Sequence, residues 1–391
     1  MRRKAPGLVA VAAATSILAS CSLPGVSTSP TAEPTPSASP STSPTATPVV
    51  CTNQSMLAAW SLTRLAEQTL VIPVAETDVA AVTSEVAAGA GGVILFGTSA
   101  PSTLPTSLRT LAAASGGIAP FVMTDEEGGV VQRMANLAGS LPSARQMAAT
   151  MTPAQIRQLV TTVALRMHAA GVTMDLAPVL DLDNGQGPNN RDPDGTRSFS
   201  LNPTTAAADG IAFMQGLEAG GIVPVVKHFP GLGQASGNTD VAPASTQPWS
   251  SLQRAGLLPF ENAFASGAPV VMIANATVPG LSTLPASISP VVMTTVLRDQ
   301  LGFRGLVMTD SLSAGALAHI GYSVPKAVVA AISAGADMVL YTAAAAQVAS
   351  VTSATVAALV AAVNAGTLTR DRLAAAVANI LVAKNVHLCA G

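Results

Sequence analysis

Ionisable residues that could do acid–base chemistry cluster directly after short apolar runs. In the stretch Val225–Asp240, VVKHFPGLGQASGNTD, Lys227 and His228 follow an apolar run, and a loop of small and polar residues then leads to Asp240. Adjacent ionisable residues at a strand end have few structural uses, whereas a strand end facing a pocket is where a barrel enzyme keeps its ligand contacts. A surface lysine beside a buried histidine is the alternative for one such pair. Similar clusters after other apolar runs favour a site.

An acidic cluster follows the apolar run FVMT. It reads DEEGG over Asp125–Gly129, and Arg133 comes shortly after it. Three carboxylates beside an apolar strand are costly to bury unless they meet a ligand, a metal or a basic partner. The two glycines allow a sharp turn and the close approach of a ligand. A solvent-exposed acidic turn is the alternative.

Aspartates follow two more apolar runs. Asp181 and Asp183 come after APVL, and a long loop rich in Asn, Asp, Gly and Pro, which suits a pocket wall, leads on to Arg197. Alternating aspartates could bind Ca²⁺, but the EF-hand glycine and terminal glutamate are missing, so we expect no metal. Asp310 follows GLVMT. It is a candidate nucleophile for chemistry at an oxocarbenium-like centre, or else the N-cap of the next helix.

Short apolar runs alternate with longer helical stretches, several of which open with Thr-Pro, Asn-Pro or Ser-Pro, where proline suits the first turn. This alternation favours an α/β fold, a (β/α)8 TIM barrel in a single catalytic domain. A doubly wound open sheet would want a Gly-rich phosphate loop after an early strand, and no run has that form. The predicted strands are Thr69–Val74, Gly92–Phe96, Pro120–Thr124, Thr173–Leu176, Ile222–Val226, Val270–Ala274, Leu306–Thr309 and Met338–Leu340. The predicted helices include Thr77–Ala88, Pro153–Ala170, Pro203–Ala219, Leu252–Ser266, Pro290–Leu301 and Arg370–Val386.

The first fifty residues have the features of an exported, lipid-anchored protein. Residues 1–20 combine a basic start with an apolar run too short to span a bilayer, as in a signal peptide. The run ends in Leu-Ala-Ser-Cys, which resembles the lipobox of bacterial lipoproteins and implies acylation of Cys21 after cleavage. Residues 21–50 are Ser, Thr, Pro and Ala-rich, which predicts a disordered tether. We expect the protein on the extracytoplasmic face of the cell membrane; an ordinary secretory signal with a chance cysteine is the alternative.

Composition sets other classes of function aside. The net charge is −2, only 10% of residues are charged, and no basic patch indicates nucleic-acid binding. After Cys21 no uninterrupted apolar span has the length of a transmembrane helix. In an exported chain Cys51 and Cys389 could join the ends of the folded part, residues 51–391, by a disulfide. Two free buried thiols are the alternative.

Six ordered motifs together resemble the family-3 glycoside hydrolases, specifically their single-domain β-N-acetylhexosaminidase branch, over nearly all of Leu65–Val386. The motifs are GGVILF (Gly91–Phe96), DEEGGVVQR (Asp125–Arg133), LAPVLDL (Leu176–Leu182), RSF (Arg197–Phe199), KHFPG (Lys227–Gly231) and TDSLSAGA (Thr309–Ala316). The resemblance implies that Asp310 is the nucleophile and that neither metal nor cofactor is needed. It also implies a set of residues that hold N-acetylglucosamine in the −1 subsite: Asp125, Arg133, Arg197, Lys227 and His228.

The chain departs from this family at the position of the general acid/base. The branch reads KHFPGHG, followed by a loop with Asp-Ser-His whose histidine is the general acid/base. Here Leu232 replaces the second histidine of the first motif, and Asn238-Thr239-Asp240 stands in place of Asp-Ser-His. Either Asp240 is the acid/base, which requires surroundings such as a nearby Asp310 that favour its protonated form, or the site turns over slowly.

The resemblance implies a monomeric, retaining exo-β-N-acetylglucosaminidase that removes terminal N-acetylglucosamine from peptidoglycan-derived glycosides or muropeptides. Its partners would be these sugars and, through Cys21, a lipid membrane. The main alternative is a catalytically weak or inactive sugar-binding lipoprotein on the same fold. A β-glucosidase of the same family would usually carry a second domain and an aromatic residue after the nucleophile, where this chain has Ser311-Leu312.

Overall fold

The computed structural model describes residues 52–389. Several predictions fall outside these residues: the signal peptide of residues 1–20, the tether of residues 21–50, acylation of Cys21, and Cys51 as a disulfide partner. Cys389 is disulfide-bonded. Its pairing with Cys51 stays a prediction.

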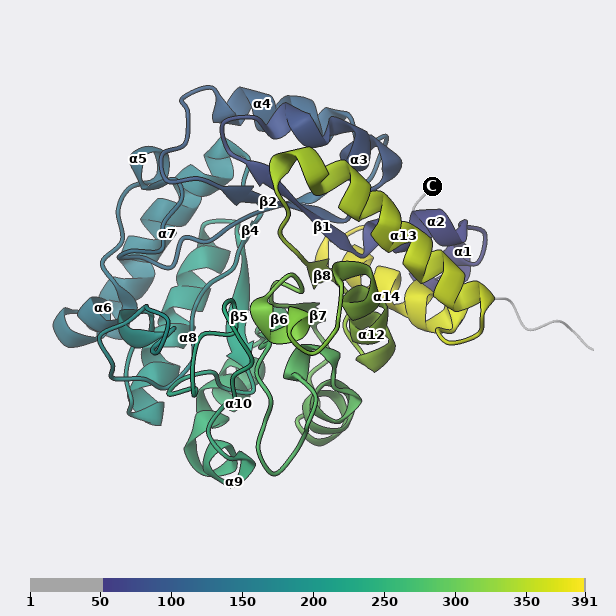
Figure 1. Cartoon of the computed structure of the whole chain (residues 1–391). Helices are drawn as coiled ribbons and strands as arrows, with labels where there is room; N and C mark the ends of the chain where they lie inside the picture. Colours follow the sequence, from purple (N-terminus) through teal and green to yellow (C-terminus); the bar gives the residue numbers. More distant parts are fainter. Residues whose placement is uncertain (1–51, 390–391) are drawn as a thin grey trace, which may run out of the picture. The chain divides into compact units, whose positions relative to one another are not determined.

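A parallel sheet curls round to form a barrel (Figure 1). Its strands lie in the order β7-β6-β5-β4-β3-β2-β1-β8, and an isolated parallel bridge from Met308 to Met338 joins the two ends of that order. The strands are β1 (Leu70–Ala75), β2 (Gly92–Phe96), β3 (Phe121–Thr124), β4 (Met174–Asp175), β5 (Val223–Phe229), β6 (Val270–Ile273), β7 (Leu306–Thr309) and β8 (Val339–Leu340). The predicted (β/α)8 barrel is therefore confirmed.

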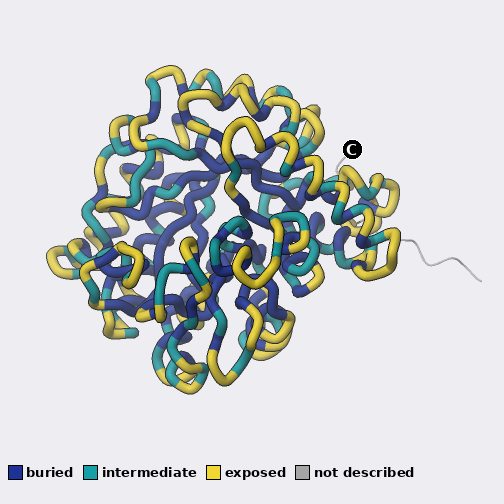
Figure 2. Tube along the Cα trace, viewed as in Figure 1, coloured by how far each residue is buried: buried dark blue, intermediate teal, exposed yellow. Residues whose placement is uncertain are grey.

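The strands are almost wholly buried because side chains cover both of their faces (Figure 2). One set packs outward against the helices. The other fills the barrel interior, where Val71, Ile94, Met123, Val225 and Met308 belong to one cluster. The strands are short and apolar, so the polar residues that follow them begin at the end of the barrel where the strands terminate.

Helices surround the strands, as Figure 1 shows. The predicted helix Pro153–Ala170 is observed as α7 and Pro203–Ala219 as α8, each with proline in its first turn and an N-cap, Thr152 or Asn202. The others are α1 (Asn53–Leu57), α2 (Leu62–Gln68), α3 (Thr83–Ala88), α4 (Leu104–Ala113), α5 (Ala135–Ala138), α6 (Ala144–Thr150), α9 (Trp249–Ser251), α10 (Leu258–Ala265), α11 (Gly315–Ala318), α12 (Val324–Ala334), α13 (Val348–Asn364) and α14 (Arg370–Ala383).

Three predicted helices differ in detail from those observed. The stretch Thr77–Ala88 divides into a 3₁₀ turn, η1 (Val79–Val82), and α3. Leu252–Ser266 begins as a π-helical turn, η3 (Leu252–Gly256), and continues as α10, while η5 (Val291–Gln300) is π-helical throughout. Apolar periodicity places a helix but does not distinguish hydrogen bonds to the third, fourth or fifth residue.

One apolar helical segment has a length and composition that would allow it to cross a membrane. It is Ala345–Asn364, with mean hydropathy 1.7, and it comprises η6 (Ala345–Gln347) and α13. In the barrel this helix packs against α12, α2 and β1, with Thr355 and Leu359 fully buried. These contacts bury one side of the helix against the barrel wall.

Candidate active site

A cavity of about 460 Å³ opens where the strands end. It is lined by residues at the carboxyl end of strand β5, such as Lys227 and His228, and by residues that follow β3, β7 and β8; these converge because parallel strands in a barrel all end on the same side. Every side chain predicted for catalysis or sugar binding is among its lining residues: Asp125, Arg133, Arg197, Lys227, His228, Asp240 and Asp310. The structure therefore brings together all the residues named for the site from sequence.

An ion-pair network forms one wall of this cavity. Lys227 Nζ lies 3.0 Å from Asp125 Oδ1 and 2.6 Å from Glu127 Oε1, and Arg133 Nη2 lies 3.5 Å from Asp125 Oδ2. Arg197 donates two hydrogen bonds to Glu127, from Nε at 2.7 Å and Nη2 at 2.8 Å. Burial tends to raise the pKa of Glu127, but Arg197 and Lys227 outweigh it and hold that pKa well below its usual range. The network is thus a fixed array of charged donors and acceptors, suited to sugar hydroxyls.

The middle carboxylate of DEEGG has a different task. Glu126 is fully buried, and its Oε1 accepts hydrogen bonds from the backbone N–H groups of Arg133 and Met134, both at 2.6 Å. The chain returns to Glu126 because Gly128 has a φ of 101°, and a side chain there would meet the carbonyl oxygen of Pro142 at 2.2 Å. Glu126 shapes the loop that presents Asp125 and Glu127, so the predicted sharp turn is confirmed.

Asp181 holds the carboxyl end of β5 and the segment that follows it. Its Oδ2 accepts hydrogen bonds from His228 N at 3.0 Å and is 2.7 Å from His228 Nδ1, while its Oδ1 accepts one from Leu232 N at 2.6 Å. Burial, together with the nearby Arg197 and Lys227 charges, lowers the pKa of His228 to about 4, so the imidazole is neutral at pH 7. With Nδ1 engaged by Asp181, Nε2 remains for the cavity that His228 lines.

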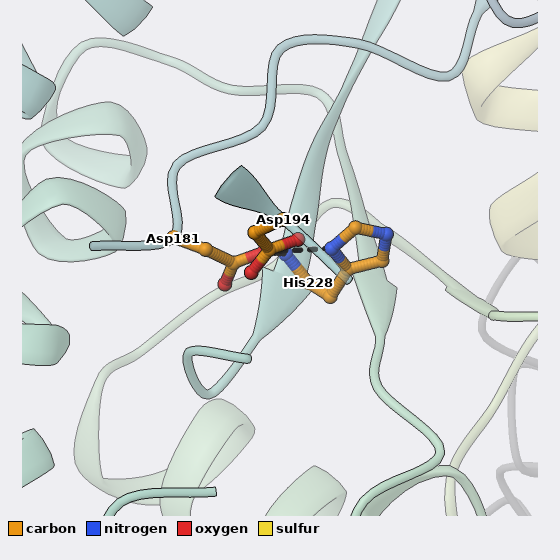
Figure 3. A group of neighbouring side chains, drawn as sticks. All are labelled: Asp181, Asp194 and His228. Atoms are coloured by element: carbon orange, nitrogen blue, oxygen red, sulfur yellow. Dashed lines mark hydrogen bonds and ion pairs between the residues drawn. The ribbon is translucent and has the colours of Figure 1, made fainter. Parts of the chain in front are cut away.

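Asp181, Asp194 and His228 also have the donor types of a metal site, and their ligand atoms all lie within 4.8 Å of one another (Figure 3). Both oxygens of Asp181 and Nδ1 of His228 already have hydrogen-bond partners, whereas neither oxygen of Asp194 has one. One carboxyl group without a hydrogen bond falls short of the three or four protein ligands that zinc sites use. We therefore assign Asp181 to the support of His228, with Asp194 lying beside this pair.

Asp194→Asn is expected to make stability less dependent on pH. Burial, reinforced by the charge of Asp181, raises the pKa of Asp194 to about 8; Arg197 Nη1, 3.5 Å from Oδ1, does not offset this. The folded protein thus keeps a proton that the unfolded chain releases near pH 4, and the stability from this proton is lost as the pH rises from about 4 to 8.

The asparagine amide has no such proton to lose. The free energy of unfolding, measured by urea denaturation between pH 5 and pH 8, should therefore fall less steeply in Asp194→Asn, by up to about 1.4 kcal/mol per pH unit. At or below about pH 4, where the unfolded chain also keeps this proton, the two proteins should be nearly equal. Parallel pH profiles for wild type and variant would contradict this account.

Asp310 lies at the end of β7 and faces the cavity. Its Oδ1 accepts a hydrogen bond from Ser311 N at 2.7 Å. Burial raises the pKa of Asp310. The nearby His228 lowers this pKa, and the negative charge of Asp240 raises it, so the carboxyl groups of Asp310 and Asp240 interact electrostatically. The alternative role of Asp310 as a helix N-cap is wrong, because α11 begins after Ala314.

Three acidic residues support the site although no role was assigned to them from sequence. Glu127 anchors Arg197 and Lys227, Asp181 orients His228, and Asp194 lies beside both. Glu127 and Asp181 stand inside the DEEGG and LAPVLDL motifs, which is a signal that could have identified them. Asp194 lies in the long loop before Arg197, and only its burial distinguishes it from the neighbouring polar residues.

Comparison with known proteins gives consistent matches. The family model described as glycosyl hydrolase family 3 N terminal domain matches residues 67–383. A β-hexosaminidase of Mycobacterium tuberculosis, LpqI, is 36% identical over 262 residues, which are 64% of this chain and 66% of that protein. The solved structure of M. tuberculosis LpqI is 30% identical, with a TM-score of 0.76 over 85% of this chain and 96% of that one. A β-N-acetylhexosaminidase from Beutenbergia cavernae is 30% identical, with a TM-score of 0.73 over 84% of this chain and 100% of that one.

Proposed function

This chain belongs to glycosyl hydrolase family 3, and we propose that within the family it is a retaining exo-β-N-acetylglucosaminidase. The observation that carries the proposal is a single cavity lined by both Asp310 and Asp240. The charge of Asp240 raises the pKa of Asp310, and a fixed array of charged groups suited to sugar hydroxyls lies beside them. Relatives named as β-hexosaminidases and a structure named as a family-3 β-N-acetylglucosaminidase from Paenibacillus support the sugar assignment.

The cavity favours removal of a terminal sugar. Its lining includes Ile94, Leu176, Met272 and Leu340, which belong to the packed interior of the barrel. This apolar floor closes the inner end of the cavity. A terminal sugar can enter with its leaving group directed toward solvent, as an exo-acting enzyme requires.

The two aspartates would divide the reaction between them. The ionised Asp310 carboxylate attacks the anomeric carbon while Asp240 donates its proton to the departing glycosidic oxygen, which gives a glycosyl-enzyme and the free alcohol. The Asp240 carboxylate then takes a proton from water as the water oxygen attacks the same carbon and releases Asp310. Two displacements restore the original β configuration.

The remaining side chains would bind the sugar in a fixed orientation. Two N–H groups of the Lys227 ammonium contact Asp125 and Glu127, and the third can donate a hydrogen bond to a sugar hydroxyl. Asp125 accepts hydrogen bonds, Arg133 donates them, and the neutral His228 offers Nε2 at the same wall. Because Glu127 and Asp181 lock these groups in place, little reorganisation is needed when the substrate binds.

We further propose that the enzyme acts as a monomer outside the cytoplasm, held on the cell membrane through an acylated Cys21. The basic and apolar leader with its lipobox-like ending supports this placement. Glycosides derived from peptidoglycan are the sugars that such an anchored enzyme would meet. An acyl group on Cys21 would leave the barrel able to reach them at the end of its Ser/Thr/Pro-rich tether.

The proposal is tested by following the anomer that first appears when 4-nitrophenyl β-N-acetylglucosaminide is hydrolysed. ¹H NMR during early turnover should show β-N-acetylglucosamine before the α anomer forms by mutarotation, and purified muropeptides should also release N-acetylglucosamine. Appearance of the α anomer first would contradict the retaining mechanism. The loop without a histidine favours a second candidate, a sugar-binding protein; N-acetylglucosamine binding without turnover of either substrate would select it.

A further inference from the structure

The loop that carries Asp240 rests on the segment that follows Asp310. Gly315 N donates a hydrogen bond to the carbonyl oxygen of Asp240 at 3.0 Å, and Ala316 N donates one to that of Thr239 at 2.9 Å. Consecutive residues of one segment thus hold consecutive residues of the other. Thr239 is only 3% exposed, which shows that the loop lies packed at this point.

Gly315 allows this contact because it has no side chain. A Cβ built on Gly315 would lie 2.2 Å from the carbonyl oxygen of Val241 and 2.9 Å from that of Asp240. Both distances are shorter than Cβ contacts in real proteins, and backbone atoms cannot rotate aside as a side chain can. Any side chain at this position must therefore displace the Asp240 backbone from the segment that carries the nucleophile.

The loop is also held on its other side. Asn238 N donates a hydrogen bond to the carbonyl oxygen of Asn190 at 3.2 Å, and Asp240 N donates one to Asn238 Oδ1 at 2.9 Å. Earlier in the loop, Ser236 N donates to the carbonyl oxygen of Ser245 at 2.9 Å and closes the base of the loop. The hydrogen bonds from Gly315 and Ala316 join the loop to the segment bearing Asp310, and the one from Gly315 is made to Asp240 itself.

We propose that Gly315 is a positioning residue: its N–H and its lack of a side chain hold the Asp240 carboxyl over the nucleophile before substrate arrives. The inference rests on the proposed function, in which Asp240 is the acid/base. General acid catalysis needs the proton within hydrogen-bond reach of the leaving oxygen, so a displaced backbone reduces proton transfer more than it reduces sugar binding.

Gly315→Ala tests the inference with two substrates that differ in their need for an acid. For N,N′-diacetylchitobiose, whose leaving group is a sugar hydroxyl, kcat/KM should fall by about 10²-fold. For 4-nitrophenyl β-N-acetylglucosaminide, which leaves as a stable phenolate, the fall should be less than about 10-fold. Azide should raise turnover of the aryl glycoside, because the anion attacks the anomeric carbon of the glycosyl-enzyme, breaks its bond to Asp310 and gives the β-glycosyl azide without a general base.

Gly237→Ala is the matched control on the same loop. A Cβ there meets only the carbonyl oxygen of Asn190, at 3.9 Å, so both substrates should be hydrolysed as by the wild type. Equal losses of Gly315→Ala on both substrates, or no loss on either, would overturn the inference. If Asp240→Ala shows the substrate-dependent loss but Gly315→Ala does not, only the positioning role fails; if neither shows it, the acid assignment itself fails.

A measurement on the wild type keeps the inference testable even where Gly315→Ala does not fold. Hydrogen exchange followed by mass spectrometry should show slow exchange of the Gly315 and Ala316 amides in the sugar-free enzyme, because both are donors to the loop. Exchange of both amides at the rate of an unstructured peptide would mean that the loop is not held, and would overturn the proposal.

Discussion

Replacing Asp310 by alanine is expected to lower kcat for 4-nitrophenyl β-N-acetylglucosaminide by about 10⁴-fold or more, because no other group can form the glycosyl-enzyme. Asp310 is the carboxylate at the end of β7 that lines the cavity, and burial raises its pKa above the ordinary value. Both substrate classes lose activity together, since both reactions begin with attack by this residue. The measurement is steady-state kinetics on the aryl glycoside and on N,N′-diacetylchitobiose.

The control for Asp310→Ala is Asp299→Asn, which removes an exposed carboxylate from η5, away from the cavity. This variant should keep wild-type activity and stability within about 0.5 kcal/mol. N-Acetylglucosamine should still bind to Asp310→Ala, because the ion-pair network that we propose holds the sugar does not include Asp310. A residual rate above one-tenth of wild type would require another nucleophile and would exclude the proposed mechanism.

Asp240→Ala is expected to lower the rate of hydrolysis far more for N,N′-diacetylchitobiose than for the aryl glycoside. Loss of a general acid costs about 10²- to 10⁴-fold in rate, and the full loss should appear with N,N′-diacetylchitobiose. The aryl glycoside needs little protonation of its leaving oxygen, so its first step should be nearly preserved and the glycosyl-enzyme should accumulate. Rapid-quench mass spectrometry should detect that intermediate as a sugar-sized mass increase on the peptide that contains Asp310.

The pH profile supplies a second readout for Asp240. For the aryl glycoside, Asp240→Ala should lack the decrease in kcat/KM that the wild type shows toward high pH, while keeping the decrease toward low pH that protonation of Asp310 causes. Equal losses on both substrates, together with an unchanged alkaline limb, would assign the acid/base role to another group. His228 is a poor candidate for that role because its pKa of about 4 keeps it neutral above pH 5.

The barrel and the contents of the site could be predicted from the sequence because both depend on local patterns. Short apolar runs that alternate with helical stretches determine parallel strands, and the residue after each strand must then lie at one end of the barrel. Asp125 and Asp310 each stand at such a position, and Lys227 lies near the carboxyl end of β5, which extends three residues beyond its predicted end at Val226. Their meeting in one cavity therefore follows from the chain's alternation alone.

Other features depend on contacts between residues far apart in the chain, which no local pattern specifies. Of the adjacent carboxylates in DEEGG, Glu126 turns toward backbone N–H groups while Glu127 meets Arg197, 70 residues away. The burial of Asp194 likewise depends on how its loop packs against Asp181.

The position of Asp240 was also decided by tertiary structure. The sequence placed a carboxylate on the loop where a histidine was expected, but Gly315, which bonds the Asp240 backbone, and Asn190, which bonds that of Asn238, come from two other connections of the barrel. Hydrogen bonds and excluded volume act between atoms a few ångströms apart in space, whatever their separation in sequence. Local sequence patterns thus specify which chemical groups the site contains, and tertiary packing determines which of them face the cavity and which hold the others in place.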